Sequence, residues 1–139
     1  MRLSTGSVAE TKEAIVELVW TNGFSVGVPL MDEQHKRLIV LINATQDRCS
    51  KDTIKAMFDY ADLHFKTEEK MLQERNYPGL GEQLNEHVRF LEHSNEFLSK
   101  NLSDAAICTE LNRYLCVWLS HHILEIDMKY KHFLLPVKG

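Results

Sequence analysis

Residues 54–72 read IKAMFDYADLHFKTEEKML, and apolar side chains recur through this stretch at spacings of three and four. Side chains with that spacing lie on one face of an α-helix. A histidine and a glutamate fall within the same stripe. Its members are Ile54, Met57, Phe58, Ala61, His64, Phe65, Glu68, Met71 and Leu72. The stretch therefore predicts a long amphipathic helix with two polar side chains on its buried face.

Three further stretches show the same helical spacing, one before residues 54–72 and two after it. They begin near Met31, Leu80 and Ser103, and glycine, proline or short polar breaks separate them. Four helices of roughly 20 residues with short connections are typical of an up-down-up-down four-helix bundle. We expect an all-α fold with an N-terminal arm at residues 1–29, the bundle at 30–135 and a tail at 136–139. Trp20 and Phe24 are expected to lie across the bundle.

Candidate helix caps stand near three of the expected starts. They are Asp32 for the first helix, Ser50 or Asp52 for the second, and Ser103 or Asp104 for the fourth. Short side chains with an oxygen acceptor bind the unpaired N–H groups of a first helical turn. These residues support the expected helix boundaries.

Composition limits the class of protein. The chain has 139 residues, 44% of them hydrophobic, which is typical of one globular domain. Its net charge is −4 and its Lys and Arg residues are scattered, so we do not expect a nucleic-acid partner. No apolar run approaches the roughly 20 residues of a membrane span, and the first residues lack the layout of a secretory signal. Cys49, Cys108 and Cys116 have no Cys-x-x-Cys spacing. They favour free thiols in a reducing compartment, so we expect a cytoplasmic protein.

Polar residues inside the apolar stripes are the strongest functional signal. His64 and Glu68 share a buried face, and His35, His87 and His122 occupy comparable stripe positions on the other helices. A buried carboxylate needs a cation, a proton or strong hydrogen-bond donors. Any one of these histidines alone is better explained as a core residue bonded to a backbone carbonyl. Four of them on four helices favour a metal site, and imidazole with carboxylate suits iron or manganese.

Asp127 extends this candidate set only if the fourth helix is irregular. It follows His122 by five residues, which places the two side chains about 140° apart on an ideal helix. For both to bind one site, either the side chains bend toward each other around the helix, or the helix widens locally as a π-bulge. The alternative is that Asp127 is a solvated charge near the helix end. Other acidic and histidine residues are interpreted as surface groups, namely Glu69, Glu86, Glu92, Glu125, His93, His121 and His132.

Four runs of the chain, in order, resemble the motifs of bacterial hemerythrins over residues 20–134. Trp20 and Val26-Gly27-Val28 precede the first run. The runs are MDEQH at 31–35, HFKTEEKM at 64–71, YPGL at 77–80 and WLSHHILEIDMKY at 118–130. Because several separate motifs agree, the resemblance is far more specific than any one of them.

The resemblance implies a cofactor of two iron ions (Fe2+/Fe3+) joined by an oxo or hydroxo bridge. His35 and His64 would bind one iron, and His87 and His122 the other. Glu68 and Asp127 would bridge the two. The positions that match the family's apolar dioxygen pocket are Trp118, Leu119, Ile123 and Tyr130. Apolar side chains there would exclude water and protons from the bound dioxygen and so slow its loss as peroxide.

The chain departs from the family at one ligand position. The family has a fifth histidine four residues before the one that matches His87, and here that position holds Gln83. The family's ligands leave one coordination position open for O2. If Gln83 does not bind iron, a second coordination position would be open, on the iron held by His87 and His122. The amide could instead coordinate weakly, water or an anion could replace it, or it could hydrogen-bond beside the ligands.

We therefore expect a non-haem di-iron domain, not an enzyme, that binds O2 or a small anion. A second open position favours rapid oxidation by O2, which suits an oxygen or redox sensor that regulates a signalling output. A reversible O2 store or carrier is one alternative. A di-iron oxidase or peroxidase, and a helical adaptor without metal, are the others.

Overall fold

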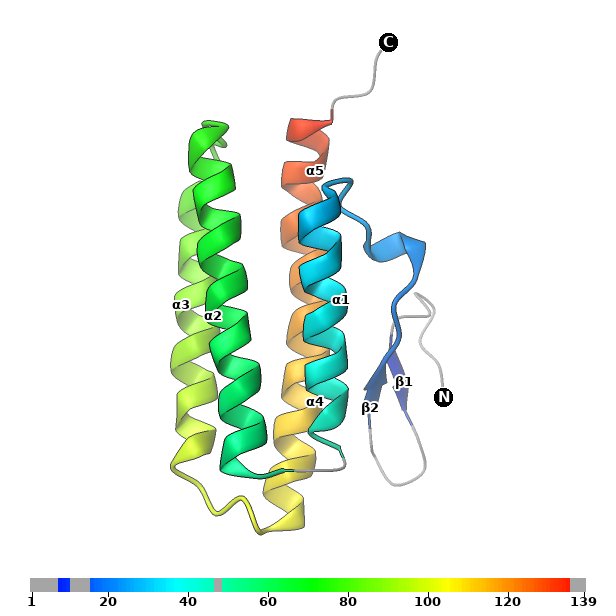
Figure 1. The fold of residues 1–139 in the computed structure, drawn as a ribbon, viewed down its shortest axis with the longest axis vertical. Helices are drawn as coiled ribbons and strands as arrows, with labels where there is room; N and C mark the ends of the chain where they lie inside the picture. Colours follow the sequence, from blue (N-terminus) through cyan, green and yellow to red (C-terminus); the bar gives the residue numbers. More distant parts are fainter. Residues whose placement is uncertain (1–7, 11–15, 47–48, 136–139) are drawn as a thin grey trace.

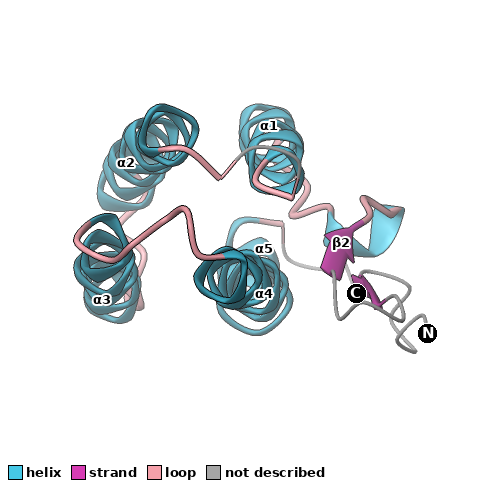
Figure 2. Cartoon of the chain, turned by 90° about the horizontal axis from the view of Figure 1, so that it is seen from below, coloured by secondary structure: helices cyan, strands magenta, loops and turns pink. Residues whose placement is uncertain are grey.

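The computed structural model describes residues 8–10, 16–46 and 49–135. Its four long helices are α1 (Pro29–Ala44), α2 (Lys51–Glu74), α3 (Leu80–Leu98) and α4 (Ala105–His121). The last helix continues through a π-helical segment, η2 (His122–Asp127), into α5 (Met128–Leu134). Consecutive helices run in opposite directions (Figure 1) and surround one interior (Figure 2). The expected up-down-up-down bundle is confirmed.

Side-chain caps begin two of the helices as the sequence predicts. Ser50 Oγ accepts the Thr53 N–H at 3.1 Å at the start of α2, and Asp104 Oδ1 accepts the Ala106 N–H at 2.9 Å at the start of α4. Asp32 does not cap α1. Its carboxylate accepts the Val26 N–H at 2.9 Å, because it lies inside the first turn and faces back over the preceding chain. Asp32 therefore fastens the arm to α1.

The N-terminal arm contains an antiparallel hairpin that the helical patterns did not predict. Strand β1 (Val8–Glu10) pairs with β2 (Val16–Leu18), and a 3₁₀ turn, η1 (Asn22–Phe24), follows. The Leu18 N–H donates to Asn43 Oδ1 at 3.0 Å, and Asn43 Nδ2 donates to the Leu18 carbonyl at 2.8 Å. Phe24 is buried and stacks on Trp20. The described part of the arm packs on the side of α1 and α4 (Figure 2); the expected tail, 136–139, lies outside the described residues.

The interior changes character along the bundle axis. The half near the end of α1 and the starts of α2 and α4 is mainly apolar and includes the buried side chains of Ile42, Ile54, Met57 and Leu111. The other half holds a group of buried histidine and carboxylate side chains. Among the described helices, none has both the length and the apolar character required to cross a membrane. The apolar half supplies the hydrophobic stability on which a buried polar group depends.

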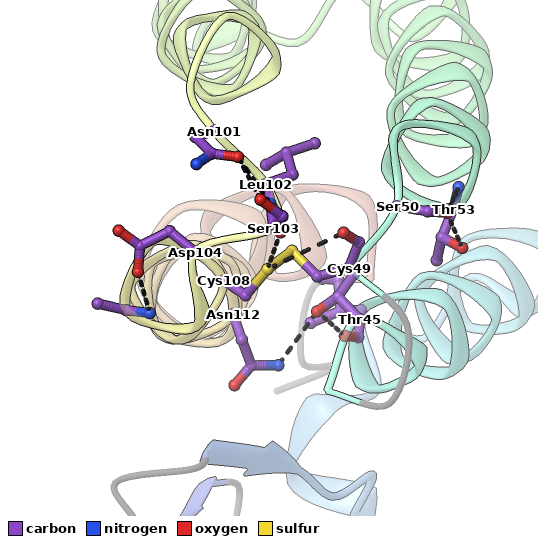
Figure 3. Close-up of a disulfide and its surroundings, with 12 residues drawn as sticks. Thr45, Cys49, Ser50, Thr53, Asn101, Leu102, Ser103, Asp104, Cys108 and Asn112 are labelled. Atoms are coloured by element: carbon purple, nitrogen blue, oxygen red, sulfur yellow. Dashed lines mark hydrogen bonds between the residues drawn. A yellow bond between two sulfur atoms is a disulfide. The ribbon is translucent and has the colours of Figure 1, made fainter.

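The expectation of free thiols is wrong for two of the three cysteines. Cys49 and Cys108 form a disulfide with a Cα–Cα distance of 5.9 Å (Figure 3). Spacing in the sequence could not show this pairing, because the two residues are separated by 59 positions and meet only when α4 packs beside the α1–α2 connection. The cysteines therefore do not indicate a reducing compartment. Cys116 lies fully buried in α4.

Candidate metal centre

Six polar side chains from every part of the bundle meet in its interior. They are His35 on α1, His64 and Glu68 on α2, His87 on α3, and His122 and Asp127 at the two ends of η2. None of the six is more than 1% exposed. The structure thus brings together all six residues that the sequence analysis singled out as candidate metal ligands.

Glu68 lies between two groups of histidines. One group comprises Glu68 with His35 and His64, and the other comprises Glu68 with His87 and His122. In each group the possible ligand atoms lie within 4.8 Å of one another. A carboxylate that belongs to both groups can hold one ion with each of its oxygens, so the arrangement suits two adjacent ions.

Asp127 is the second carboxylate of the cluster. Its Oδ1 lies 3.1 Å from His122 Nε2, and its Oδ2 lies 3.4 Å from His35 Nε2. Asp127 therefore links the histidine of α1 to that of the last helix. The two carboxylates together contact histidines of both groups.

The local π-helix explains why residues five apart reach the same site. The segment from His122 to Asp127 has π-helical hydrogen bonding, which widens the helix and gives about five residues between aligned side chains. The structure therefore shows a local widening of the helix, and the side chains of His122 and Asp127 do not have to bend around a regular helix. Both end residues of the segment point into the bundle.

The unpaired polar atoms show that the site fits a cation. Among the described residues, the buried atoms without a hydrogen-bond partner include Nε2 of His35, His64, His87 and His122, Glu68 Oε1 and Asp127 Oδ2. An unpaired buried donor or acceptor costs about 1–3 kcal/mol, so this number of them in one place needs a partner. Imidazole nitrogen with carboxylate oxygen and no thiolate is a donor set that suits iron or manganese.

Three polar side chains hold the outer nitrogens of the histidine rings. Gln34 Oε1 lies 2.7 Å from His64 Nδ1, and Glu69 Oε2 lies 2.7 Å from His87 Nδ1. Glu86 Oε1 lies 3.5 Å from His122 Nδ1. An acceptor on Nδ1 places the ring proton there and leaves Nε2 as the lone-pair donor to a metal.

Glu69 and Glu86 correct the interpretation of these residues as surface charges, and Gln34 was not considered. Each one directly precedes or follows a site residue in the sequence, so its side chain lies at the flank of the buried face. That adjacency was the available signal. The remaining five residues of the surface group are exposed, as expected: Glu92, Glu125, His93, His121 and His132.

Gln83 lies at the edge of the cluster and is 1% exposed. Its Nε2 donates a hydrogen bond to Asp127 Oδ1 at 2.9 Å. Its Oε1 is buried without a hydrogen-bond partner. The amide nitrogen is thus bound to one of the candidate ligands, and the amide oxygen is the atom left to accept a hydrogen bond or to bind a metal.

The four expected pocket residues differ in burial and in their contacts with the cluster. Leu119 and Ile123 are buried apolar side chains. The ring of Trp118 stacks on that of His122, 4.5 Å between centroids, and is half-buried. The Tyr130 hydroxyl donates to Glu68 Oε2 at 2.7 Å. Burial and then the Glu68 charge raise the pKa of Tyr130 well above its ordinary value, so the hydroxyl stays protonated as a donor.

Burial and neighbouring charges separate the protonation states of the histidines. Burial lowers the pKa of His64 to about 3, against the opposing effect of the Glu68 carboxylate. Burial also acts to lower the pKa of His122, but the nearby Asp127 carboxylate and the contact with Glu86 raise it to about 10. Without a metal, His122 therefore carries a proton that an incoming ion must displace.

Comparisons with known proteins agree on one family. The family described as hemerythrin HHE cation binding domain matches residues 26–134. A hemerythrin-like protein of Naegleria gruberi is 34% identical over 116 residues, which are 83% of this chain and 92% of that protein. A bacteriohemerythrin of Stenotrophomonas maltophilia (strain R551-3) is 28% identical over 120 residues, 81% of this chain and 78% of the relative. A crystal structure of wild-type hemerythrin superimposes with a TM-score of 0.73 at 25% identity, covering 82% and 95% of the two chains.

Proposed function

The chain belongs to the hemerythrin family, and we propose on this premise that it is an oxygen or redox sensor whose iron centre is oxidised rapidly by O2. Members of the family bind oxygen at a non-haem di-iron centre and are not enzymes. The protein is accordingly a di-iron oxygen-binding domain. Its ligands, its reactivity and its signalling role form the proposal.

We propose that His35 and His64 hold one iron and that His87 and His122 hold the other. Glu68 and Asp127 bridge the pair. The unpaired Nε2 atoms and carboxylate oxygens of the cluster support this division, as do the two histidine groups that share Glu68. When bound, the two irons would supply electrons for the reduction of O2 and an open coordination position for a small anion.

The surrounding side chains position these ligands and keep the site dry. Gln34, Glu69 and Glu86 accept the Nδ1 protons and so orient three of the four rings. Tyr130 fixes the Glu68 carboxylate through its hydroxyl. Leu119 and Ile123 exclude water, which strengthens every electrostatic interaction inside the site.

Gln83 carries the sensor proposal. An amide is a much poorer ligand to iron than the imidazole that the family has at this position, and the Gln83 nitrogen is engaged by Asp127. The side of the site formed by His87 and His122 therefore has one strong donor fewer. An open coordination position there would bind water or an anion and promote oxidation, which a reversible carrier has to suppress and a sensor can use as its output.

The N-terminal arm is the proposed route of that output. The arm turn η1 packs against η2, the segment that carries His122 and Asp127. Lys131 Nζ donates to the Ser25 carbonyl at 3.0 Å, and Asp32, three residues before His35, binds Val26. A movement of the ligands at the site is thus transmitted to the arm through the hydrogen bonds of Lys131 and Asp32. The arm in turn transmits it to a signalling partner.

The test begins with metal analysis, anaerobic reduction and optical detection after mixing with air. We expect two irons per chain and oxidation within seconds, without an oxygenated form that persists. An oxygenated form that is stable for minutes would instead establish the reversible carrier, and less than one iron per chain would refute the di-iron proposal.

Gln83→His is expected to slow the oxidation by roughly tenfold or more, because it restores a strong nitrogen donor beside His87. The matched control is Asn85→His, which adds a histidine at an exposed position of the same helix and should leave the rate unchanged. An oxidation rate in Gln83→His equal to that of the unaltered protein would remove Gln83 from the explanation.

A further inference from the structure

The Cys49–Cys108 disulfide lies at the opposite end of the bundle from the candidate metal centre. Cys49 directly precedes Ser50, the cap of α2, and Cys108 lies in the first turn of α4. The bond therefore joins the connection between the first two helices to the beginning of the last one (Figure 3). The function proposed above does not use it.

The disulfide borders a hollow that opens to solvent. The hollow has a volume of about 270 Å³, and its walls include both cysteines, Thr45, Gln46, Thr109 and Asn112. Cys49 and Cys108 are each half-buried. A small thiol can reach the sulfurs from this side, whereas a disulfide sealed in a core is inert to such reagents.

The surroundings of Cys108 also suit the reduced state. Its Sγ lies 3.0 Å from the Leu102 carbonyl oxygen, so a Cys108 thiol has a hydrogen-bond acceptor already in place. Cys108 also stands at the N-terminal end of a helix of 17 residues, where the unpaired N–H groups favour a negative charge on a departing sulfur. The acceptor favours the reduced thiol and the helix end favours the departing thiolate, so both features support reversible opening of the bond.

We propose that the Cys49–Cys108 disulfide is a reversible redox lock that clamps the α1–α2 connection to the start of α4, opened by a small dithiol that enters the hollow. The dithiol, as a thiolate, attacks the Cys49 sulfur and forms a mixed disulfide, and Cys108 leaves as a thiolate and takes a proton. The second thiol of the reagent then closes on the mixed disulfide and releases Cys49, which takes the second proton. The protein gains two electrons and two protons, and the dithiol becomes a cyclic disulfide.

The lock lies between two of the helices that surround the candidate metal centre, α1 and α4. Next to the disulfide, Asn112 Nδ2 of α4 donates to Thr45 Oγ1 beyond the end of α1 at 3.2 Å. His35 precedes Thr45 by ten residues, and His122 follows Asn112 by ten, a distance of about 15 Å along each helix. Opening the lock frees these helices to shift relative to each other. This coupling rests on the proposed iron ligands, whereas the lock itself does not.

The first experiment uses the metal-free full chain under native conditions. The protein is equilibrated with graded ratios of reduced to oxidised dithiothreitol, alkylated and mapped by mass spectrometry. We expect Cys49 and Cys108 to become alkylated together and to recover on reoxidation, whereas Cys116, fully buried, stays protected. A bond that opens only in denaturant would show a static cross-link and overturn the proposal.

Hydrogen exchange measured on the same samples tests the clamp. Reduction should increase amide exchange by about tenfold in the first turns of α4 and in residues 42–46. Cys49→Ser should show the fast exchange with or without reductant, and the control Cys116→Ala should behave as the unaltered protein. Equal exchange in the oxidised and reduced protein would refute the clamp.

The effect of the lock on the candidate metal centre is measured separately, in iron-loaded protein. Reduction, or Cys49→Ser, should accelerate the transfer of iron to a chelator several-fold relative to Cys116→Ala. An unchanged transfer rate would leave a lock without influence on the centre and would overturn the coupling. If the chain takes up no iron, the proposed function fails, and the alkylation and exchange results still decide the lock.

Discussion

At the scale of single residues, the outer partners of the histidines are as informative as the candidate ligands. Glu69 is 15% exposed and lies 2.7 Å from His87 Nδ1. A neighbouring glutamate, Glu68, points into the cluster, so two consecutive carboxylates have different tasks. A group that hydrogen-bonds the outer nitrogen of a metal-binding histidine commonly contributes about 10–100-fold to metal affinity, because it fixes the orientation and the basicity of the ring.

Glu69→Ala is expected to weaken iron binding by about 10- to 100-fold, because His87 loses the acceptor that orients its ring. Competition with a chelator of known affinity measures the change. Glu92→Ala removes an exposed glutamate from α3 and serves as the control. Equal losses in both variants would point to the change in net charge instead of the hydrogen bond to His87.

Tyr130→Phe tests the hydrogen bond to Glu68 without iron. Because the variant leaves a buried carboxylate oxygen with one donor fewer, we expect the free energy of unfolding of the metal-free protein to fall by about 1–3 kcal/mol. Urea unfolding followed by circular dichroism measures this. Tyr60→Phe, at a half-buried position of α2, is the control, and a similar small change in both variants would contradict the role given to Tyr130.

At the scale of elements, the ends of the helices determine which residues face each other across the bundle. Asp104 caps α4, four residues before Cys108, and thereby fixes where this helix begins. The π-helical segment then adjusts the last helix so that Asp127 joins the site. Local hydrogen bonding at two points thus shapes the helix that carries Cys108, His122 and Asp127.

Asp104→Ala should lower the free energy of unfolding by about 1 kcal/mol, since the Ala106 N–H loses its side-chain acceptor. Asp104→Asn keeps an oxygen acceptor at the same place and should restore most of the stability. Chemical denaturation of the three proteins measures the difference. If Asn proved as destabilising as Ala, the charge of Asp104 and not its cap would be responsible.

At the scale of the whole molecule, the disulfide closes a long segment that includes α2 and α3. The sequence separation of 59 residues corresponds to about 4 kcal/mol of stabilisation in the chain-entropy account of cross-links. Such a contribution is a large part of the stability of a domain of this size. The oxidised protein should therefore be distinctly more stable than the reduced one.

The double variant Cys49→Ser with Cys108→Ser is expected to melt roughly 10 °C below the unaltered protein under oxidising conditions, as the constraint on the unfolded chain is lost. Thermal unfolding by calorimetry measures the midpoint. In excess reductant the two proteins should melt at similar temperatures. A difference that persists in reductant would assign the loss to the serine side chains.

The bundle and its polar centre were predictable because both depend on periodicity. Apolar residues spaced by three and four identify each buried face, and a histidine or carboxylate in such a stripe must point inward with the rest. The four histidines and Glu68 came together for this reason, whereas Asp127 joined them through the π-helical segment. The hairpin was not predictable, because its two strands have three residues each and short strands leave hardly any periodic signal.

The sequence by itself therefore determined the four helices, their order and the polar side chains on their buried faces, since helical spacing is a local property. Only the tertiary structure decided that Glu69 and Glu86 bind histidines, that Gln83 donates to Asp127 and that Cys49 pairs with Cys108. These contacts join residues on different elements. Their distances depend on how the helices pack and on a π-helical turn, and no spacing along one chain segment contains that information.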